Sequence, residues 1–300
     1  MTGQTPFGRY PDAVETVADS MAAPTARARR PRRSFTRLAW SLVFVAGVLY
    51  FFLPLVGTFE FSLGHPWGPV GAPPTFDYYA TVVASRQFWE SLGYSFVIGV
   101  ITIVVSLAIL VPTAFWVRLR VPRARPLIEF ITLLPFVIPP IVLVFGLIQT
   151  YSHGPLPLTH TDIGSSALLA AAYVVLSFPY MYRAVDTGLQ AIDVRSLTEA
   201  AQSLGAGWPR ILIRVILPNL RVALLSGAFL TLAIVIGEFT IATFLARPAF
   251  GPYLSLLGTN KAYEPAAVSL ISFGLTWLAM ILIAFIGRGS RSRVTVAGAR

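Results

Sequence analysis

Very few residues in this 300-residue chain have the type and spacing that catalysis requires. The sequence contains no cysteine, which excludes disulfides, thiolate catalysis and cysteine metal sites. Its three histidines, His65, His153 and His160, are scattered without the spacing of metal ligands. There is no phosphate-binding Gly-x-x-x-x-Gly-Lys-Ser/Thr loop, no Gly-x-Ser-x-Gly elbow and no His-Glu-x-x-His helix. We therefore expect no catalytic residue, no metal site, no cofactor and no ATP hydrolysis by this chain itself.

One carboxylate, that of Glu238, stands inside a long apolar run. An ionisable side chain within a membrane span is costly and marks a functional site by default. Glu238 can face a transport path and meet a cationic cargo, or it can act as a gate residue. The alternative is a carboxylate that is hydrogen-bonded to a neighbouring helix or to a partner subunit, and the sequence leaves both open. Glu129 and Asp186 lie at the ends of apolar runs, near water, and we assign them no role.

A polar stretch between two apolar runs has the pattern of a capped helix, a turn and a second helix. Ser196 and Glu199, three residues apart, match a capping box, and a glutamate is favoured near the positive end of a helix dipole. Gly205 and Gly207 allow the short helix to end and the chain to turn. The apolar residues of 208–215 then recur at helical spacing, directly before the next apolar run.

This stretch resembles the EAA motif of the permease subunits of binding-protein-dependent ABC importers. That motif reads Glu-Ala-Ala, three residues, Gly, nine residues, Ile, one residue, Leu-Pro. Six positions agree with the spacing intact, and Val215 stands at the isoleucine position. The resemblance implies that a coupling segment at about 196–218 docks on a cytoplasmic ATPase subunit. Its site residues are Glu199, Ala200, Ala201, Gln202, Ser203, Leu204, Gly205, Leu217 and Pro218.

The composition places the chain in a bilayer. Hydrophobic residues make up 55% of it and charged residues only 12%, about half the charged fraction of a soluble domain. Apolar runs of membrane-spanning length predict an all-α membrane protein with six transmembrane helices. The expected spans are 38–55, 91–117, 127–150, 164–182, 222–245 and 266–286.

The third of these spans contains Pro135, Pro139 and Pro140, which remove backbone hydrogen bonds inside the membrane. We expect a kinked or broken helix there. Irregular backbone is tolerated at membrane depth where it lines a cavity or is covered by neighbouring helices. The prolines are therefore candidate residues of a transport path, and a kink that serves only helix packing is the alternative.

The distribution of basic residues predicts the topology. With the N-terminus inside, the inner segments hold 20 of the 23 Lys and Arg residues, and the outer loops hold only Arg86, Arg247 and Lys261. The positive-inside rule then places both termini and the 196–218 segment in the cytoplasm. We expect a disordered basic tail at 1–37, a transmembrane permease domain at 38–287 and a second cytoplasmic tail at 288–300. This asymmetry and membrane lipid account for the net charge of +10, so no nucleic-acid partner is expected.

The resemblance covers about residues 88–287 and implies the type I ABC importer permease fold in the plasma or inner membrane. It also implies a cytoplasmic ABC ATPase dimer, a second permease subunit that is a different chain, and an extracytoplasmic substrate-binding protein. The last would dock on the outer loops at 58–90 and 247–265. The residues of 134–140 and 237–239 look most like permeases of the polyamine group, so a spermidine- or putrescine-type cargo is expected first. Iron, thiamine and phosphonate are the other candidates.

A gradient-driven secondary transporter or channel is the main alternative from another class. Such a protein would place more ionisable residues within its spans, and it would have no reason to carry the EAA-like helix. A membrane-embedded enzyme would need paired polar residues inside the spans, and few occur. The sequence therefore favours a permease subunit, without enzymatic activity of its own, of an import system.

Overall fold

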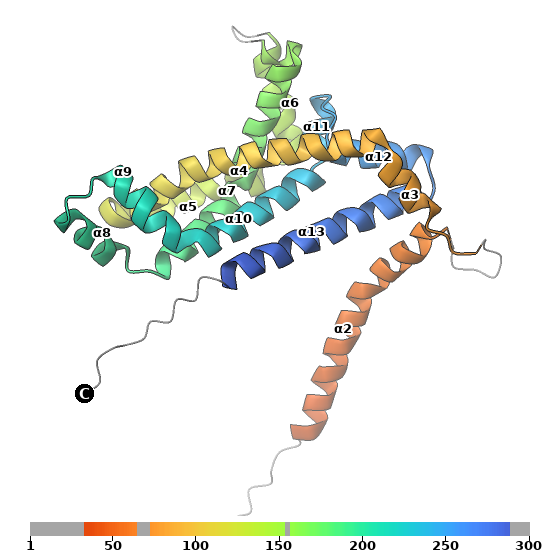
Figure 1. The fold of residues 1–300 in the computed structure, drawn as a ribbon, viewed down its shortest axis with the longest axis horizontal. Coiled ribbons are helices and arrows are strands. Elements are labelled where there is room, and N and C mark those ends of the chain that lie inside the picture. Colours follow the sequence, from red (N-terminus) through yellow and green to blue (C-terminus); the bar gives the residue numbers. More distant parts are fainter. Residues whose placement is uncertain (1–32, 65–72, 154–156, 289–300) are drawn as a thin grey trace, which may run out of the picture. The chain divides into compact units, whose positions relative to one another are not determined.

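The computed structural model describes residues 33–64, 73–153 and 157–288, and within these ranges every regular element is helical (Figure 1). The chain divides into two units between Leu55 and Val56. The first unit contains most of α2 (Arg33–Ser62), which is apolar along most of its length. The second unit contains the end of α2 followed by α3 (Asp77–Ala84), α4 (Arg86–Arg120), η1 (Pro122–Ala124), α5 (Arg125–Val137), α6 (Pro140–Ser152), η2 (Leu158–His160), α7 (Asp162–Gln190), α8 (Val194–Ser203), α9 (Trp208–Ile211), η3 (Leu212–Ile216), α10 (Leu217–Gly237), α11 (Thr240–Phe244), α12 (Phe250–Asn260) and α13 (Glu264–Arg288).

The core of the second unit is built from α4, α7 and α10, which pack closely because glycines face the neighbouring helix. A Cβ atom added at Gly227 on α10 would lie 2.8 Å from the Met181 sulfur, and one added at Gly188 on α7 would lie 2.7 Å from Ala223 Cβ. Lipid tails are as apolar as the side chains, so close packing through small residues is a main source of helix association in a membrane. These glycines thus fix α7 against α10.

The third apolar run is a broken span, as the prolines predicted. The segments Pro122–Val137 and Pro140–Ser152 are bent by 94° relative to each other. Pro139 has extended backbone with ψ of 137°, and neither Pro139 nor Pro140 has an N–H to continue the helix. Pro135 lies within α5 and does not end it. The break is therefore confirmed, and it lies at the Pro139–Pro140 pair.

The fifth apolar run begins earlier and ends sooner than predicted. α9, η3 and α10 form one apolar helix, Trp208–Gly237, of 30 residues. Its η3 part is a π-helical turn, next to which the Asn219 side-chain amide donates to the Val215 carbonyl at 2.7 Å. The prediction of a helix over 222–245 is wrong at both ends. The helix instead ends before Glu238, and the Glu238 carboxylate caps the separate helix α11.

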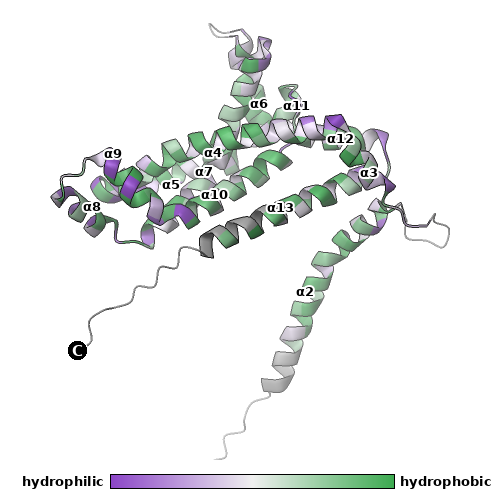
Figure 2. Ribbon diagram, viewed as in Figure 1, coloured by the Kyte–Doolittle hydropathy of each residue, from purple (hydrophilic) through white to green (hydrophobic). Residues whose placement is uncertain are grey.

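Four of the described helices are long and apolar enough to cross a membrane, and the bent α5–α6 pair raises the number to five. α13, which occupies the place of the sixth expected span, is a helix of 25 residues. Six spans and the side on which each end lies remain predictions. Polar residues gather on α8 and α9 at one end of the second unit and near α12 at the other, with apolar helices between them (Figure 2).

Most of the two expected tails, residues 1–32 and 289–300, lies outside the described residues. Residues 33–37, which we expected in the disordered tail, instead form the start of α2, so the helix begins before the apolar run does. The two expected outer loops also contain helices: α3 lies within 58–90 and α12 within 247–265.

Candidate functional site

The EAA-like segment folds as a capped helix, α8, followed by a glycine turn and α9. The N-cap is Asp193, which accepts from the Ser196 N–H at 3.1 Å and from the Ser196 hydroxyl at 2.7 Å. These hydrogen bonds lower the pKa of Asp193 below its ordinary value, and the bond from the Ser196 hydroxyl contributes most to this shift. The predicted capping box is wrong, because the helix begins at Val194 and Ser196 already lies inside it. Glu199 instead pairs with Arg195 at 3.0 Å.

The turn after α8 requires glycine at one position only. Gly205 has φ of +78°, its N–H donates to the Gln202 carbonyl at 2.9 Å, and the Ala206 N–H donates to the Ala201 carbonyl at 3.0 Å. This pair of bonds is a Schellman motif, which ends a helix and reverses the chain. Gly207 has φ of −76° and ψ of 161°, an extended conformation open to any residue. The expectation of a special conformation is therefore met at Gly205 and not at Gly207.

The motif residues of α8 form an uncovered surface. Val194 and Thr198 face the core and are buried, whereas Leu204 at the tip of the helix is 88% exposed. Leu204 is thus an apolar side chain that no residue in the described part of the chain covers. We name as the α8 face the exposed residues Glu199, Ala200, Gln202, Ser203 and Leu204, beside the half-buried Ala201.

The α8 face is held rigidly on the bundle beneath it. Val194 of α8 and Ile211 of α9 lie in one buried cluster with residues of α4, α7 and α10. Of the remaining motif residues, Leu217 packs against this cluster as Ala201 does, and Pro218 is exposed at the start of α10. A displacement of α8 must therefore move the helices on either side of it.

An arginine between two tryptophans adds a second anchor. The guanidinium of Arg120, at the end of α4, lies 5.2 Å from the ring centroid of Trp208 and 5.8 Å from that of Trp116. Cation–π contacts of this kind are strongest with tryptophan. Beside them, between the end of α4 and α8, is a groove of about 490 Å³ that is lined by Arg195 and Glu199 among others. The sequence did not indicate this anchor.

A second group of charged residues, to which the sequence analysis gave no role, links α5 to α7. Arg125 Nη2 lies 2.9 Å from Asp186 Oδ2, and Arg125 Nε lies 2.9 Å from Glu129 Oε1. The Gln190 amide also donates to Asp186 Oδ2 at 2.6 Å. Asp186 is only 6% exposed, whereas the side chains of Arg125 and Glu129 are 44% and 38% exposed, so a buried carboxylate is paired with a partner that reaches the surface. The spacing of Arg125 and Glu129 was visible in the sequence, whereas the partner 61 residues away was not.

Glu238 lies at the break between α10 and α11, and its carboxylate is occupied by hydrogen bonds from the protein. It accepts from the N–H groups of Ile241, at 2.9 Å, and Ala242, at 3.2 Å, and from the hydroxyl of Tyr173 on α7, at 2.9 Å. Of the alternatives that the sequence left open, this geometry matches a carboxylate bonded to a neighbouring helix.

The two breaks bring the short helices α6 and α11 together. The rings of Phe145 on α6 and Phe244 on α11 are 4.9 Å apart. Pro139 and Pro140 are exposed where α6 begins, and Pro135 is half-buried within α5. The candidate path residues therefore lie at two breaks in the helices, with Glu238 held by α7 and the prolines at the surface of α5 and α6.

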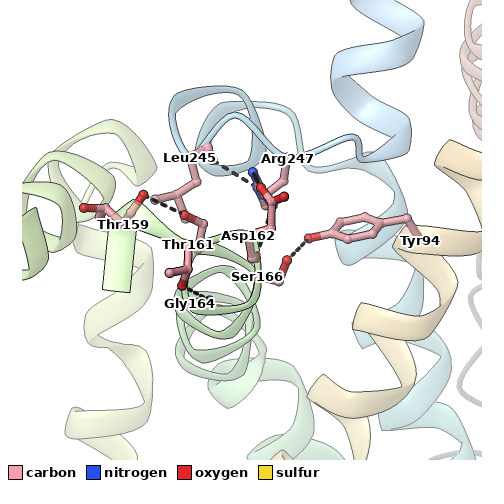
Figure 3. Close-up of polar contacts among 9 residues, drawn as sticks. Tyr94, Thr159, Thr161, Asp162, Gly164, Ser166, Leu245 and Arg247 are labelled. Atoms are coloured by element: carbon pink, nitrogen blue, oxygen red, sulfur yellow. Dashed lines mark hydrogen bonds and ion pairs between the residues drawn. The ribbon is translucent and has the colours of Figure 1, made fainter. Parts of the chain in front are cut away.

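A third charged contact joins the segment after α11 to the start of α7 (Figure 3). Arg247, after α11, pairs with Asp162 at 2.6 Å and also donates to the carbonyls of Asp162 and Leu245. Nearby, the Tyr94 hydroxyl of α4 donates to Ser166 of α7 at 2.8 Å. In the part of the chain that the structure describes, no group of three or more His, Asp or Glu side chains could hold a metal ion.

Comparison with known proteins gives a consistent picture. Residues 109–295 match the family model described as the binding-protein-dependent transport system inner membrane component. A protein of Haloferax volcanii, named as a probable molybdenum ABC transporter permease, is 31% identical over 86% of this chain and 96% of its own length. A Salmonella typhimurium protein whose name proposes a 2-aminoethylphosphonate transport system permease is 26% identical over 78% of this chain and 88% of its own length.

The fold is also similar to solved structures. A bacterial ABC transporter involved in the import of the acidic polysaccharide alginate aligns with a TM-score of 0.63 at 17% identity, over 88% of this chain and 97% of that one. It has also been solved with an alginate pentasaccharide-bound periplasmic protein, with a TM-score of 0.59 at 16% identity, over 90% of this chain and all of that one. The relatives named above are not polyamine permeases, so they do not support the expected polyamine cargo.

Proposed function

The chain belongs to the family of binding-protein-dependent transport system inner membrane components, as a multi-pass permease subunit of an ABC importer, and we propose that it couples the passage of a small oxyanion to ATP hydrolysis on a separate chain. The observation that carries the coupling role is the α8 face. This surface is exposed, and the helix that carries it is capped, ended by Gly205 and anchored in the buried core. A cytoplasmic ABC ATPase dimer is the partner that this surface would take.

The oxyanion cargo is proposed from the relatives. Their names refer to molybdenum and to 2-aminoethylphosphonate. Dissolved molybdenum is an oxyanion in oxygenated water, and a phosphonate carries negative charge at neutral pH. A polyamine, in contrast, is a cation. Glu238 is the carboxylate that was expected to meet it, and it already accepts hydrogen bonds from three donors of the protein, Tyr173, Ile241 and Ala242. The names of the relatives therefore support an anionic cargo rather than a polyamine.

We further propose that a substrate-binding protein docks at the end of the second unit away from α8. α3 and α12 lie at that end (Figure 1), and they pack around a shared cluster that includes Val82, Phe88, Phe250 and Tyr253. A rigid surface is what a docking protein needs, since ordering a loop on binding costs affinity. A second permease subunit, encoded as a different chain, would complete the path.

The test of coupling is co-purification with the ATPase subunit from cells that express the whole transporter. Leu204→Asp and Glu199→Arg should lose the ATPase while still inserting in the membrane. Burial of a leucine contributes about 1.5–3 kcal/mol, so we expect Leu204→Asp to weaken retention by roughly ten-fold or more.

The matched control is Glu90→Arg. Glu90 and Glu199 both form an exposed i,i+4 pair with an arginine, Arg86 and Arg195 respectively. The same charge reversal is therefore made on α4, where no ATPase should touch it. If the variants at Glu199 and Leu204 retain the ATPase as Glu90→Arg does, and keep ATP-dependent uptake at the wild-type rate, α8 is not the coupling element.

A further inference from the structure

A cavity of about 570 Å³ opens between α5, α7 and α10. It lies in the half of these helices nearer to α8, because its lining extends to Thr187, one turn before α7 ends, and to Ala223, two turns after α10 begins. Thr132 on α5 and Ser226 on α10 add hydroxyl groups to the wall. The wall of the cavity is therefore mainly apolar, with a few polar groups, and both hydroxyls donate to carbonyls of their own helices.

Two aromatic rings are in contact at the wall of this cavity, and one of them, Phe136, is 59% exposed. Phe136 on α5 and Tyr180 on α7 are in edge-to-face contact, with ring centroids 5.3 Å apart. Phe136 is followed by Val137, the last residue of α5, so the ring pair lies at the break of the α5–α6 span.

Arg183 is the one cation among the residues that line the cavity, and Glu129 is the one anion. It follows Tyr180 by three residues, so both side chains lie on the same face of α7, and both line the cavity. The nearby carboxylates of Glu129 and Asp186 are both paired with Arg125. Within the residues that the structure describes, Arg183 has neither an ion pair nor a hydrogen bond from its side chain, and it is exposed. A charged residue in a span is retained where it faces a water-filled path or a partner.

We propose that this cavity is the inner vestibule of the transport path, in which Arg183 attracts the oxyanion cargo beside the Phe136–Tyr180 ring pair. This inference rests on the proposed function and adds to it the residues that recognise the charge of the cargo. Arg183 is suited to the role because its guanidinium binds oxyanions through planar, paired N–H groups. The hydroxyls of Tyr180 and Thr187 lie beside it on α7 and can donate to the same anion.

The absence of cysteine from the chain allows a direct test of the local potential. Ser226→Cys places a unique thiol of this chain on the opposite wall of the cavity. In the assembled, nucleotide-free transporter, its rate of modification is measured with an anionic and with a cationic methanethiosulfonate of similar size. Arg183→Gln should lower the ratio of anionic to cationic rates by about ten-fold at low salt, and Arg183→Lys should restore it. Arg221→Gln is the matched control, since Arg221 is exposed on α10 but does not line the cavity.

Uptake into proteoliposomes supplies the second readout, with molybdate and 2-aminoethylphosphonate as probes. Arg183→Gln should reduce ATP-dependent uptake at least five-fold with the ATPase still bound, whereas Arg183→Lys retains it. An unchanged rate ratio, or a Ser226→Cys thiol that is covered by a partner subunit or lipid and does not react, would overturn the vestibule. Normal uptake by Arg183→Gln would do the same and leave the importer function standing. A wild-type transporter that imports neither anion would overturn the proposed cargo instead.

Discussion

Replacement of Glu238 by alanine should destabilise the protein, because this side chain holds a break in the helices together. Its carboxylate accepts from the N–H groups at the start of α11 and from the Tyr173 hydroxyl. Tyr173 is 1% exposed, so water cannot replace the lost acceptor. The effect should be on stability first, and on transport only through the position of α11.

The size of the effect follows from the groups left without a partner. A buried hydroxyl that loses its acceptor costs about 1–3 kcal/mol, and the loss of a helix cap costs about 0.5–2 kcal/mol. Glu238→Ala should therefore cost roughly 2–4 kcal/mol in total. For a chain of 300 residues, that corresponds to a fall in melting temperature of roughly 3–6 °C.

The assay is intrinsic fluorescence during heating of the purified protein in detergent at one scan rate, for which the six tryptophans supply the signal. Tyr173→Phe provides the control, because phenylalanine has no hydroxyl to leave unsatisfied. The double variant should be less destabilised than the sum of the two single variants, by about 1–2 kcal/mol. If Glu238→Gln instead abolishes uptake at an unchanged melting temperature and the two sites are additive, Glu238 acts on the cargo and the capping role is refuted.

Three further predictions follow from the α8 segment and the charged link between α5 and α7. Gly205→Ala should strain the turn by about 1–2 kcal/mol, because φ is +78° at this position although the surrounding space is open. The rate of proteolysis within the α8 segment should rise in this variant, whereas Gly207→Ala should leave that rate unchanged. Arg125→Gln should lower stability by about 3 kcal/mol, since it leaves the buried Asp186 without a charged partner; the melting temperature measures this, and an unchanged value would show that Asp186 is neutral. Folding lowers the pKa of Asp193, so the stabilisation of α8 by this carboxylate should be complete above the ordinary value of 3.8. It should be lost as the pH falls through the lowered pKa. Retention of the ATPase as a function of pH measures this, and Asp193→Asn should remove the pH dependence.

The features that the sequence predicted correctly are those set by neighbours along the chain. The helix breaks at Pro139 and Pro140, where two successive residues have no N–H to donate, whereas the single Pro135 is accommodated within α5. Gly205 follows a short amphipathic helix, where the need for a positive φ is a local property. Predictions failed where two local choices were equally good. Asp193 and Ser196 are both suitable N-caps, and the sequence does not say which one the helix uses.

The features that the sequence could not supply are contacts between distant residues. Asp186 and Arg125 are 61 positions apart, and Tyr173 and Glu238 are 65 apart. Hydropathy also could not show that the fifth apolar run stops at Glu238, because a carboxylate that caps a following helix sits within apolar neighbours on both sides. The same residue misled the choice of cargo, since its role as a cap gives no information about what is transported.

α7 connects every part of the candidate site. Its end leads through Asp193 into α8, and one turn before that end Asp186 binds α5. Arg183 faces the cavity, Tyr173 holds the break before α11, and Asp162 at the start of the helix binds Arg247. A packed helix transmits displacement as a rigid body more readily than by bending. If α8 is the coupling element, a push on the α8 face would reach the cavity beside Arg183 and the break at Glu238 along this one helix.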